Sequence, residues 1–264
     1  MDKIQRGIVD LVSIAVNPEP FFEPKLDKIE SSVDGFIGIV SNNQLYLNSL
    51  ANERVTGYTN LLITCVCLIS SIILLSTKTH GFYQFIRKFL MILFHFTMAF
   101  GSVFGFTVHA FTINAQILSG LWLALYASLI FALMFLFFQA FWEVSALTFI
   151  IMLPFVLLGA YFDLILCWTY DLFICIGAFA VVFGFFMGII HFSRSLKSGA
   201  HFCMFVSDLI ALCGVAVQAT HFRVGDWDKN AFFHLAVAIF ILVSSISLSV
   251  ILKKERTSRR AKSD

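Results

Sequence analysis

Long apolar segments separated by short polar ones make up the pattern of the chain after residue 57. Seven such segments lie at about residues 58–76, 88–111, 115–140, 144–161, 164–190, 200–220 and 231–252. Each is long enough to cross a hydrocarbon core of about 30 Å as an α-helix, the fourth only just. Because the connections are short, consecutive helices are expected to be antiparallel neighbours. The pattern predicts an all-α, polytopic membrane protein with seven transmembrane helices.

Composition supports an integral membrane protein and argues against nucleic acid as a partner. Of the 264 residues, 59% are hydrophobic and only 13% are charged, and the mean hydropathy is +0.89. Soluble domains average nearer to a quarter charged residues. Basic residues are not interleaved with aromatic ones outside the C-terminal tail, so nucleic acid is not an expected partner. The expected partners are the lipid bilayer and a lipid substrate or ligand, in an endomembrane or in the plasma membrane.

Charge divides the chain into three parts and predicts its orientation. Residues 1–57 have mixed charge and are expected to form an extramembrane or interfacial region, residues 58–252 the bundle, and residues 253–264 a basic tail. If the N-terminus is outside or luminal, the inward loops and the tail carry most of the basic residues of the bundle. The outward loops then carry only Arg223 and Lys229. The positive-inside rule therefore predicts N-outside and C-cytosolic. The tail is expected to anchor the chain to anionic lipid or to act as a retention or partner signal.

One stretch within the second apolar segment combines polar and small residues. His95, Ser102 and His109 recur every seven residues, so they share one face of a helix. Gly101 and Gly105 form a small-xxx-small pair on the same stretch. Polar and small residues on a lipid-embedded helix face other helices. We expect the glycine pair to allow close packing, and His95 to be a hydrogen-bonded interior histidine.

Three histidines from three helices lie at one predicted membrane level. His109 ends the second apolar segment, His221 follows the sixth and His234 begins the seventh. Imidazole and carboxylate are the ligands of catalytic zinc, which lowers the pKa of a bound water and makes it a nucleophile. The alternative is that each ring only contacts water at the membrane interface, and His221 favours this alternative.

Two aspartates lie deeper in the predicted helices. Asp171 and Asp208 could form a proton or cation path together with His95, or they could be buried structural hydrogen-bonding groups. The structural interpretation is favoured. The cysteines all lie in apolar runs, where they act as small packing residues.

Three stretches of the sequence resemble the CREST superfamily of membrane hydrolases, which includes alkaline ceramidases and the progestin and adipoQ receptors. They are NERVTGYTN entering the first apolar segment, GSVFGFTVHAF ending the second and DWDKNAFFHLA entering the last. The resemblance implies a seven-helix fold and a zinc-dependent hydrolase of lipid amides or esters. His109 and His234 match histidines that bind zinc in the family.

The chain departs from the family pattern at three positions. Gly105 stands where the family has a serine, although Ser102 lies on the same face one turn earlier. Asn230 replaces the first histidine of a pair, and Gly120 lies where an aspartate is expected. A third zinc ligand would therefore have to come from elsewhere, and the candidates are His221, Asp226, Asp228 and Glu53.

Three functions follow from these features. The first is a divergent lipid hydrolase, with His109, His234 and His221 as metal ligands and with Asp228 and Ser102 in the catalytic site. The second is a non-enzymatic receptor-like or scaffold protein. The third is a proton-coupled transporter, and the lack of proline in the last three segments gives no hint of the broken helices common in transporters.

Overall fold

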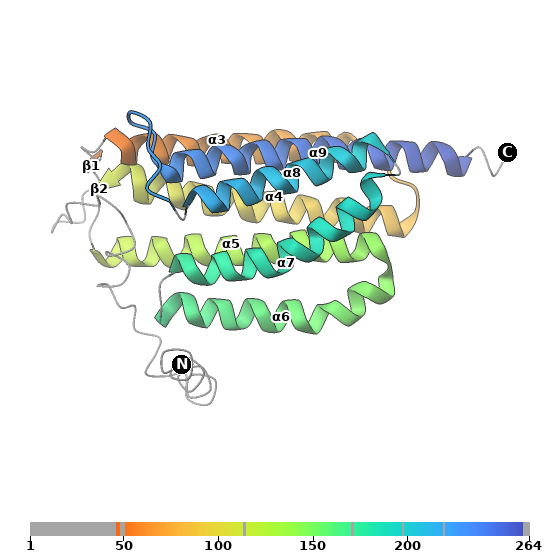
Figure 1. Cartoon of the computed structure of the whole chain (residues 1–264), viewed down its shortest axis with the longest axis horizontal. Coiled ribbons are helices and arrows are strands. Elements are labelled where there is room, and N and C mark those ends of the chain that lie inside the picture. Colours follow the sequence, from red (N-terminus) through yellow and green to blue (C-terminus); the bar gives the residue numbers. More distant parts are fainter. Residues whose placement is uncertain are drawn as a thin grey trace.

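Long helices make up nearly all of the described chain. The computed structural model describes residues 46–47, 51–112, 115–169, 172–196, 198–218 and 220–260. Its helices are α3 (Ala51–Ser76), α4 (Gly81–Ala110), α5 (Ala115–Val144), α6 (Ala146–Thr169), α7 (Leu172–Ser195), α8 (Gly199–Gln218) and α9 (Lys229–Arg260). Two short strands, β1 (Tyr46–Leu47) and β2 (Phe111–Thr112), pair antiparallel beside the start of α3 and the end of α4. Successive helices run in opposite directions along the bundle, as predicted (Figure 1).

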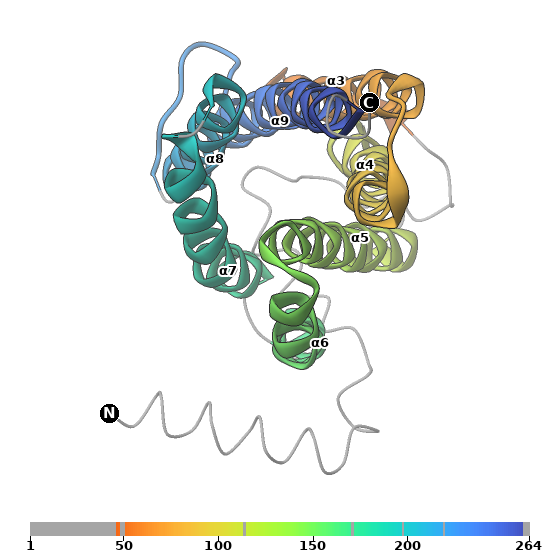
Figure 2. The same ribbon diagram turned by 90° about the vertical axis from the view of Figure 1, so that its right-hand side faces the viewer.

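Six of these helices form a closed ring. Around the ring, α3 contacts α4, α4 contacts α5, α5 contacts α7, α7 contacts α8, α8 contacts α9, and α9 contacts α3. The view along the bundle shows this ring, with α6 outside it against α5 and α7 (Figure 2). Large apolar side chains of α6 such as Leu147, Ile150 and Phe155 are exposed, which suits contact with lipid. The ring is the scaffold on which the interior polar residues are arranged.

The predicted seven apolar helices are present within the described residues, and the chain is a multi-pass integral membrane protein. Six of them are long and apolar enough to cross a membrane within the part of the chain whose side chains are described, and the described part of α7, Ala180–Ser195, is also apolar. The orientation and the membrane concerned stay predictions. Residues 1–45, most of the predicted N-terminal region, lie outside the described part of the chain.

Several helices extend beyond the predicted boundaries, among them α4, which begins at Gly81 rather than at residue 88, and α6, which ends at Thr169 rather than at residue 161. Helix α3 begins at Ala51 rather than at residue 58, and α9 continues to Arg260, through most of the segment expected to be a tail. The early residues Glu53 and Thr56 are polar, which is why the sequence pattern placed them outside the bundle. Both side chains are fully buried, and both are bonded to other helices. Long-range pairing therefore lets polar residues lie within the first turns of α3.

Glycines set how closely several neighbouring helices approach. A Cβ at Gly57 would lie 2.9 Å from the Ala110 Cβ, and a Cβ at Gly105 would lie 2.5 Å from the Asn60 Oδ1 atom. On the other side of α4, a Cβ at Gly101 would lie 3.1 Å from the Ser128 Cβ in α5. Because lipid gives little hydrophobic driving force for helix association, such small-residue contacts are a main source of packing energy. The predicted packing role of the Gly101–Gly105 pair is confirmed.

A buried histidine links three helices in the middle of the bundle. His95 in α4 is fully buried, and its Nδ1 atom lies 3.3 Å from the Ser71 hydroxyl of α3. Its Nε2 atom lies 2.9 Å from the Ser245 hydroxyl of α9. With both ring nitrogens bonded, the predicted structural role of His95 is confirmed.

Candidate functional site

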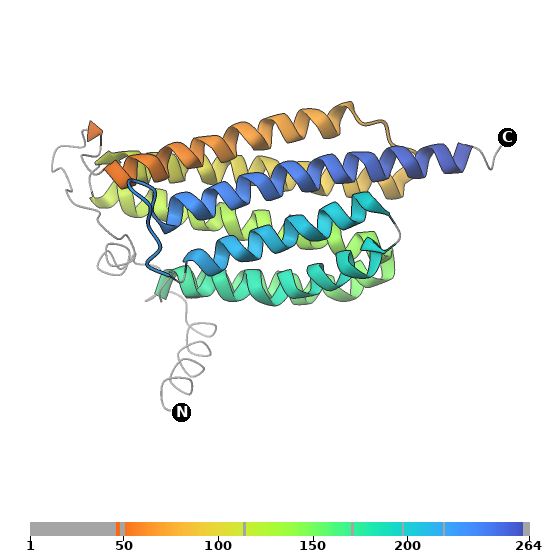
Figure 3. The ribbon, with the colours of Figure 1, turned by 45° about the horizontal axis from the view of Figure 1, so that its top comes forward.

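The site begins with an acid–imidazole pair between the first two helices of the ring. Helices α3 and α4 form an antiparallel hairpin, so the first turn of α3 and the last turn of α4 lie at the same end of the bundle (Figure 3). There the Nδ1 atom of His109 lies 2.6 Å from the Oε2 atom of Glu53, whose side chain is fully buried. A carboxylate buried away from water needs such a partner. The pairing fixes the orientation of the His109 ring.

His234 in α9 is held by a second hydrogen bond to α3. Its Nδ1 atom lies 3.0 Å from the Thr59 hydroxyl, which itself donates to the Thr56 carbonyl oxygen at 2.8 Å. Because the hydroxyl proton is used for the carbonyl, the hydroxyl oxygen accepts from His234 Nδ1–H. The Nε2 atom of a neutral His234 ring is therefore a hydrogen-bond acceptor.

The two histidines predicted to share a site do converge. The ring centroids of His109 and His234 lie 6.3 Å apart, with an interplanar angle of 64°. On the other side of His109, the Trp122 ring of α5 packs edge-on at 5.3 Å. Three consecutive members of the ring, α3, α4 and α5, together with α9, thus position one imidazole pair. We call this part of the bundle, defined by Glu53, His109 and His234, the histidine end.

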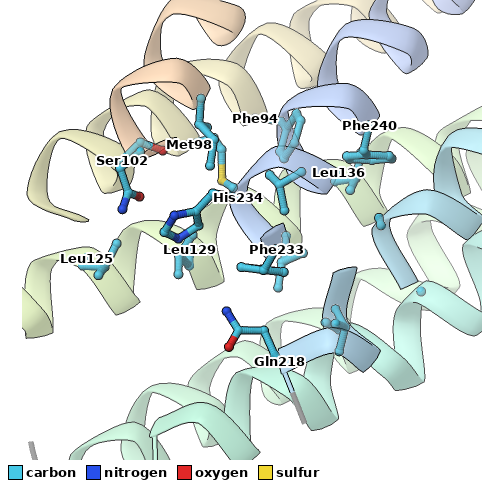
Figure 4. A pocket seen from close by; sticks show the side chains of 18 of the residues that line it. Phe94, Met98, Ser102, Leu125, Leu129, Leu136, Gln218, Phe233, His234 and Phe240 are labelled. Carbon is cyan, nitrogen blue, oxygen red and sulfur yellow. The ribbon is translucent and has the colours of Figure 1, made fainter. Parts of the chain in front are cut away.

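The imidazole pair lies in the wall of an interior cavity of about 210 Å³. Along α4 the lining runs from His109 to Phe94, which corresponds to about 22 Å of helix axis at 1.5 Å per residue. Ser102 and Asn60 are in the wall near the histidine end, and Figure 4 shows His234 and Gln218 pointing into the same space. The remaining wall is mostly aliphatic and aromatic: Ile63, Phe94, Met98, Leu125, Leu129, Leu133, Leu136, Phe137, Met187, Phe233, Val237 and Phe240.

Asp228 and His221, both predicted site residues, do not line this cavity. The Oδ1 atom of Asp228 accepts hydrogen bonds from the Thr56 hydroxyl and from the Ala231 backbone N–H, both at 2.8 Å. These bonds cap the start of α9 and hold it against α3. His221 is exposed in the connection between α8 and α9. Of the predicted site residues, the structure therefore brings together His109, His234 and Ser102 around one space.

A second acid–imidazole pair joins α7 and α8. The Oδ2 atom of Asp208 in α8 lies 2.6 Å from the Nδ1 atom of His191 in α7, and both side chains are buried. Asp208 also lines the cavity. Sequence analysis placed Asp208 in a helix interior but missed His191, because a pair seventeen residues apart on two helices leaves no local pattern. Asp171, the other predicted member of the path, lies outside the described residues.

A network of charged residues joins five helices at the opposite end of the bundle. Glu143 of α5 lies 3.0 Å from Arg87 of α4, 3.1 Å from Arg194 of α7 and 3.3 Å from His201 of α8. Arg87 also lies 2.9 Å from Glu255 of α9. We call this part, defined by Arg87, Glu143 and Glu255, the charged end. Arg87 was expected in a loop, but it lies within α4 because these carboxylates neutralise its charge.

The donor set at the histidine end was tested against the predicted zinc. Two imidazoles lie edge to face there, but the Glu53 carboxylate is hydrogen-bonded to His109 rather than placed as a third ligand. Within the residues that the structure describes, no group of three His, Cys, Asp or Glu side chains could hold a metal ion. Catalytic zinc needs three protein ligands. The described residues thus fit zinc incompletely, and metal binding stays a prediction.

No protein-family model matches the chain, and no curated protein matches it significantly.

Proposed function

We propose that this protein binds an uncharged amphiphile, such as a lipid alcohol or a lipid amide, inside its ring of helices. The observation that carries the proposal is the interior cavity, with polar side chains at its histidine end and an apolar wall beyond them. Binding sites for small molecules have this character, with a few placed polar groups and a mainly hydrophobic lining.

The size of the cavity supports a ligand rather than a packing defect. Its volume of about 210 Å³ is larger than the roughly 150 Å³ apolar cavity that takes up benzene in an engineered protein. Voids of this size are few in close-packed interiors. Glycines contribute to the space, since a Cβ at the buried Gly184 in the cavity wall would meet nothing within 4 Å.

The charges at the histidine end favour an uncharged polar group. The Glu53 carboxylate is hydrogen-bonded to His109 and is not among the residues that line the cavity. The other polar side chains in this part of the wall include the hydroxyl of Ser102 and the amides of Asn60, Asn230 and Gln218, none of which is charged. A charged head group would lose its hydration without finding a countercharge, which is costly in an apolar interior. Hydroxyl and amide groups can instead exchange hydrogen bonds with imidazole and side-chain amides.

Binding of 1-decanol by the purified protein tests this proposal. We expect saturable binding of 1-decanol, and weaker binding of decanoate and decylammonium, which have the same chain but a charged head. Gly184→Phe places a ring in the cavity and is expected to reduce binding at least tenfold. Gly188→Phe is the matched control, because Gly188 lies one turn further on α7, has equal room and is outside the lining. Equal binding by both variants, or none by the wild type, contradicts the proposal.

Hydrolysis of a lipid amide or ester at the same place is a second candidate function. The observation that favours it is the oriented His109 ring beside His234, because a carboxylate-bonded imidazole is a common general base. The resemblance to the membrane hydrolases points the same way. Turnover of a lipid amide that is lost in both His109→Gln and His234→Gln would support this candidate. Lack of both turnover and stoichiometric zinc in the purified protein would reject it.

A further inference from the structure

The carboxylate of Asp208 is an unusual feature of the cavity wall. The Asp208 side chain is only 3% exposed, and its Oδ1 atom is buried without a hydrogen-bond partner in the structure. The lining also contains Phe137, Met187 and Leu212, whose side chains offer no donor. A buried carboxylate oxygen normally accepts a hydrogen bond. Because Asp208 lines the cavity, a ligand there is the candidate source of the missing donor.

His191 holds the carboxylate in place for such a donor. Its Nδ1 atom lies 2.6 Å from Asp208 Oδ2, which leaves Oδ1 as the carboxylate oxygen without a partner. The two residues lie on neighbouring helices of the ring, α7 and α8. This arrangement fixes the direction of the available oxygen and compensates the charge of the carboxylate. A neutral donor such as a hydroxyl group suits it better than a cation.

The spacing of the two polar regions sets the geometry of the ligand. Gly214 of α8 packs against Phe233 and Ala236 of α9, which flank His234. Asp208 is six residues before Gly214, which is about 9 Å along the helix axis, and ten residues before Gln218, about 15 Å. The Asp208 carboxylate is thus separated from the histidine end by the length of a medium alkyl chain, and the wall between them is apolar.

We infer that Asp208 and His191 form a second polar subsite, which binds a hydroxyl group at the far end of the ligand. The inference rests on the proposed binding function and narrows its ligand class to apolar chains with a hydrogen-bonding group at each end. One end bonds with His234 and the neighbouring amides. The other donates a hydrogen bond to Asp208 Oδ1.

Three probes of equal chain length test the inference: 1-decanol, 1,10-decanediol and 10-methoxydecan-1-ol. The wild type is expected to bind the diol about tenfold tighter than 1-decanol, because a hydrogen bond to a charged group is worth roughly that ratio. The methoxy compound carries an acceptor but no donor, so it is expected to bind more weakly than the diol. Asp208→Asn places an amide N–H toward the cavity and is expected to remove the preference for the diol over the methoxy compound.

Controls separate this subsite from the cavity itself. Gln218→Leu, at the histidine end, is expected to weaken all three probes by a similar factor and to keep their ratios. Ratios within one variant do not depend on how much of the protein folds, and the wild-type ratios are decisive even if Asp208→Asn does not fold. Equal affinity of the wild type for 1-decanol and the diol overturns the subsite but leaves the proposed function. Binding of none of the probes overturns both.

Discussion

The two ends of the bundle are both rich in buried polar side chains, but they use them differently. At the histidine end, His109 and His234 are each tied to α3 and also line the cavity. At the charged end, Glu143 and Arg87 are bonded to side chains of neighbouring helices and are absent from the lining. The histidine end presents polar groups to the cavity, whereas the ion pairs of the charged end hold neighbouring helices of the ring together.

The difference shows what burial of a polar group alone can and cannot indicate. Glu53 and Glu143 are equally buried carboxylates, but Glu53 pairs with one histidine while Glu143 contacts two arginines and a histidine. The several ion pairs of the Glu143 network join neighbouring helices, which suits a structural role. The partner of Glu53 faces a cavity, which suits recognition of a ligand. Variants at the two ends should therefore separate stability from binding.

The largest expected loss of stability follows Glu143→Gln at the charged end. Removing this charge leaves the buried Arg87 with only the half-buried Glu255, and breaking a buried pair typically costs about 3–5 kcal/mol of unfolding free energy. Thermal unfolding in one detergent, followed by circular dichroism, measures the loss. The double variant Arg87→Met with Glu143→Leu should regain part of it, because apolar side chains can replace a buried pair. A fully stable Glu143→Gln protein would contradict the structural role of the network.

A smaller loss is expected from Gly105→Ala, which tests the packing of α3 on α4 near the histidine end. The added Cβ would lie 2.5 Å from Asn60 Oδ1, so the helices or the amide must shift, at about 1–3 kcal/mol. Asn60→Ala in the same chain should remove most of this cost, which the double-mutant cycle measures. Gly120→Ala is the control, since nothing lies within 4 Å of its Cβ. Equal effects at both glycines would argue against close packing at Gly105.

The smallest effect is expected for Asp228, which was predicted as catalytic but caps α9 in the structure. Asp228→Ala removes the bonds to Thr56 and Ala231 and is expected to cost about 1 kcal/mol of unfolding free energy. Asn is an equally good cap, so Asp228→Asn should be close to the wild type in stability and in 1-decanol binding. If Asp228→Asn instead lost a hydrolytic activity while remaining stable, the catalytic prediction would hold.

Apolar patterning predicted the helices well. Each membrane-spanning segment must satisfy its own backbone hydrogen bonds, which favours a helix whatever its neighbours are. It also placed His109 and His234 at one level, since helix direction and residue spacing fix depth. The boundaries were less accurate where a polar residue has a distant partner. Arg87 lies within α4, and Glu53 within α3, for this reason.

The rest of the site depends on contacts that leave no local trace in the sequence. The pairing of His191 with Asp208 depends on how α7 packs on α8, and the exposed position of His221 depends on the path of one connection. The cavity depends on the whole ring, which no single helix reveals. Predicting these features would need the arrangement of the helices and not only their number.

Photolabelling tests most directly whether the ring encloses a ligand site. A 1-decanol analogue with a diazirine in the chain, activated by light and mapped by mass spectrometry, is expected to label residues of the cavity wall such as Leu133, Met187 and Phe240. Excess unlabelled 1-decanol should abolish this labelling, and Gly184→Phe should reduce it. Labelling confined to exposed residues such as Leu147 and Phe155 of α6, without competition, would show that the alcohol only dissolves in the surrounding lipid and would contradict the proposed site.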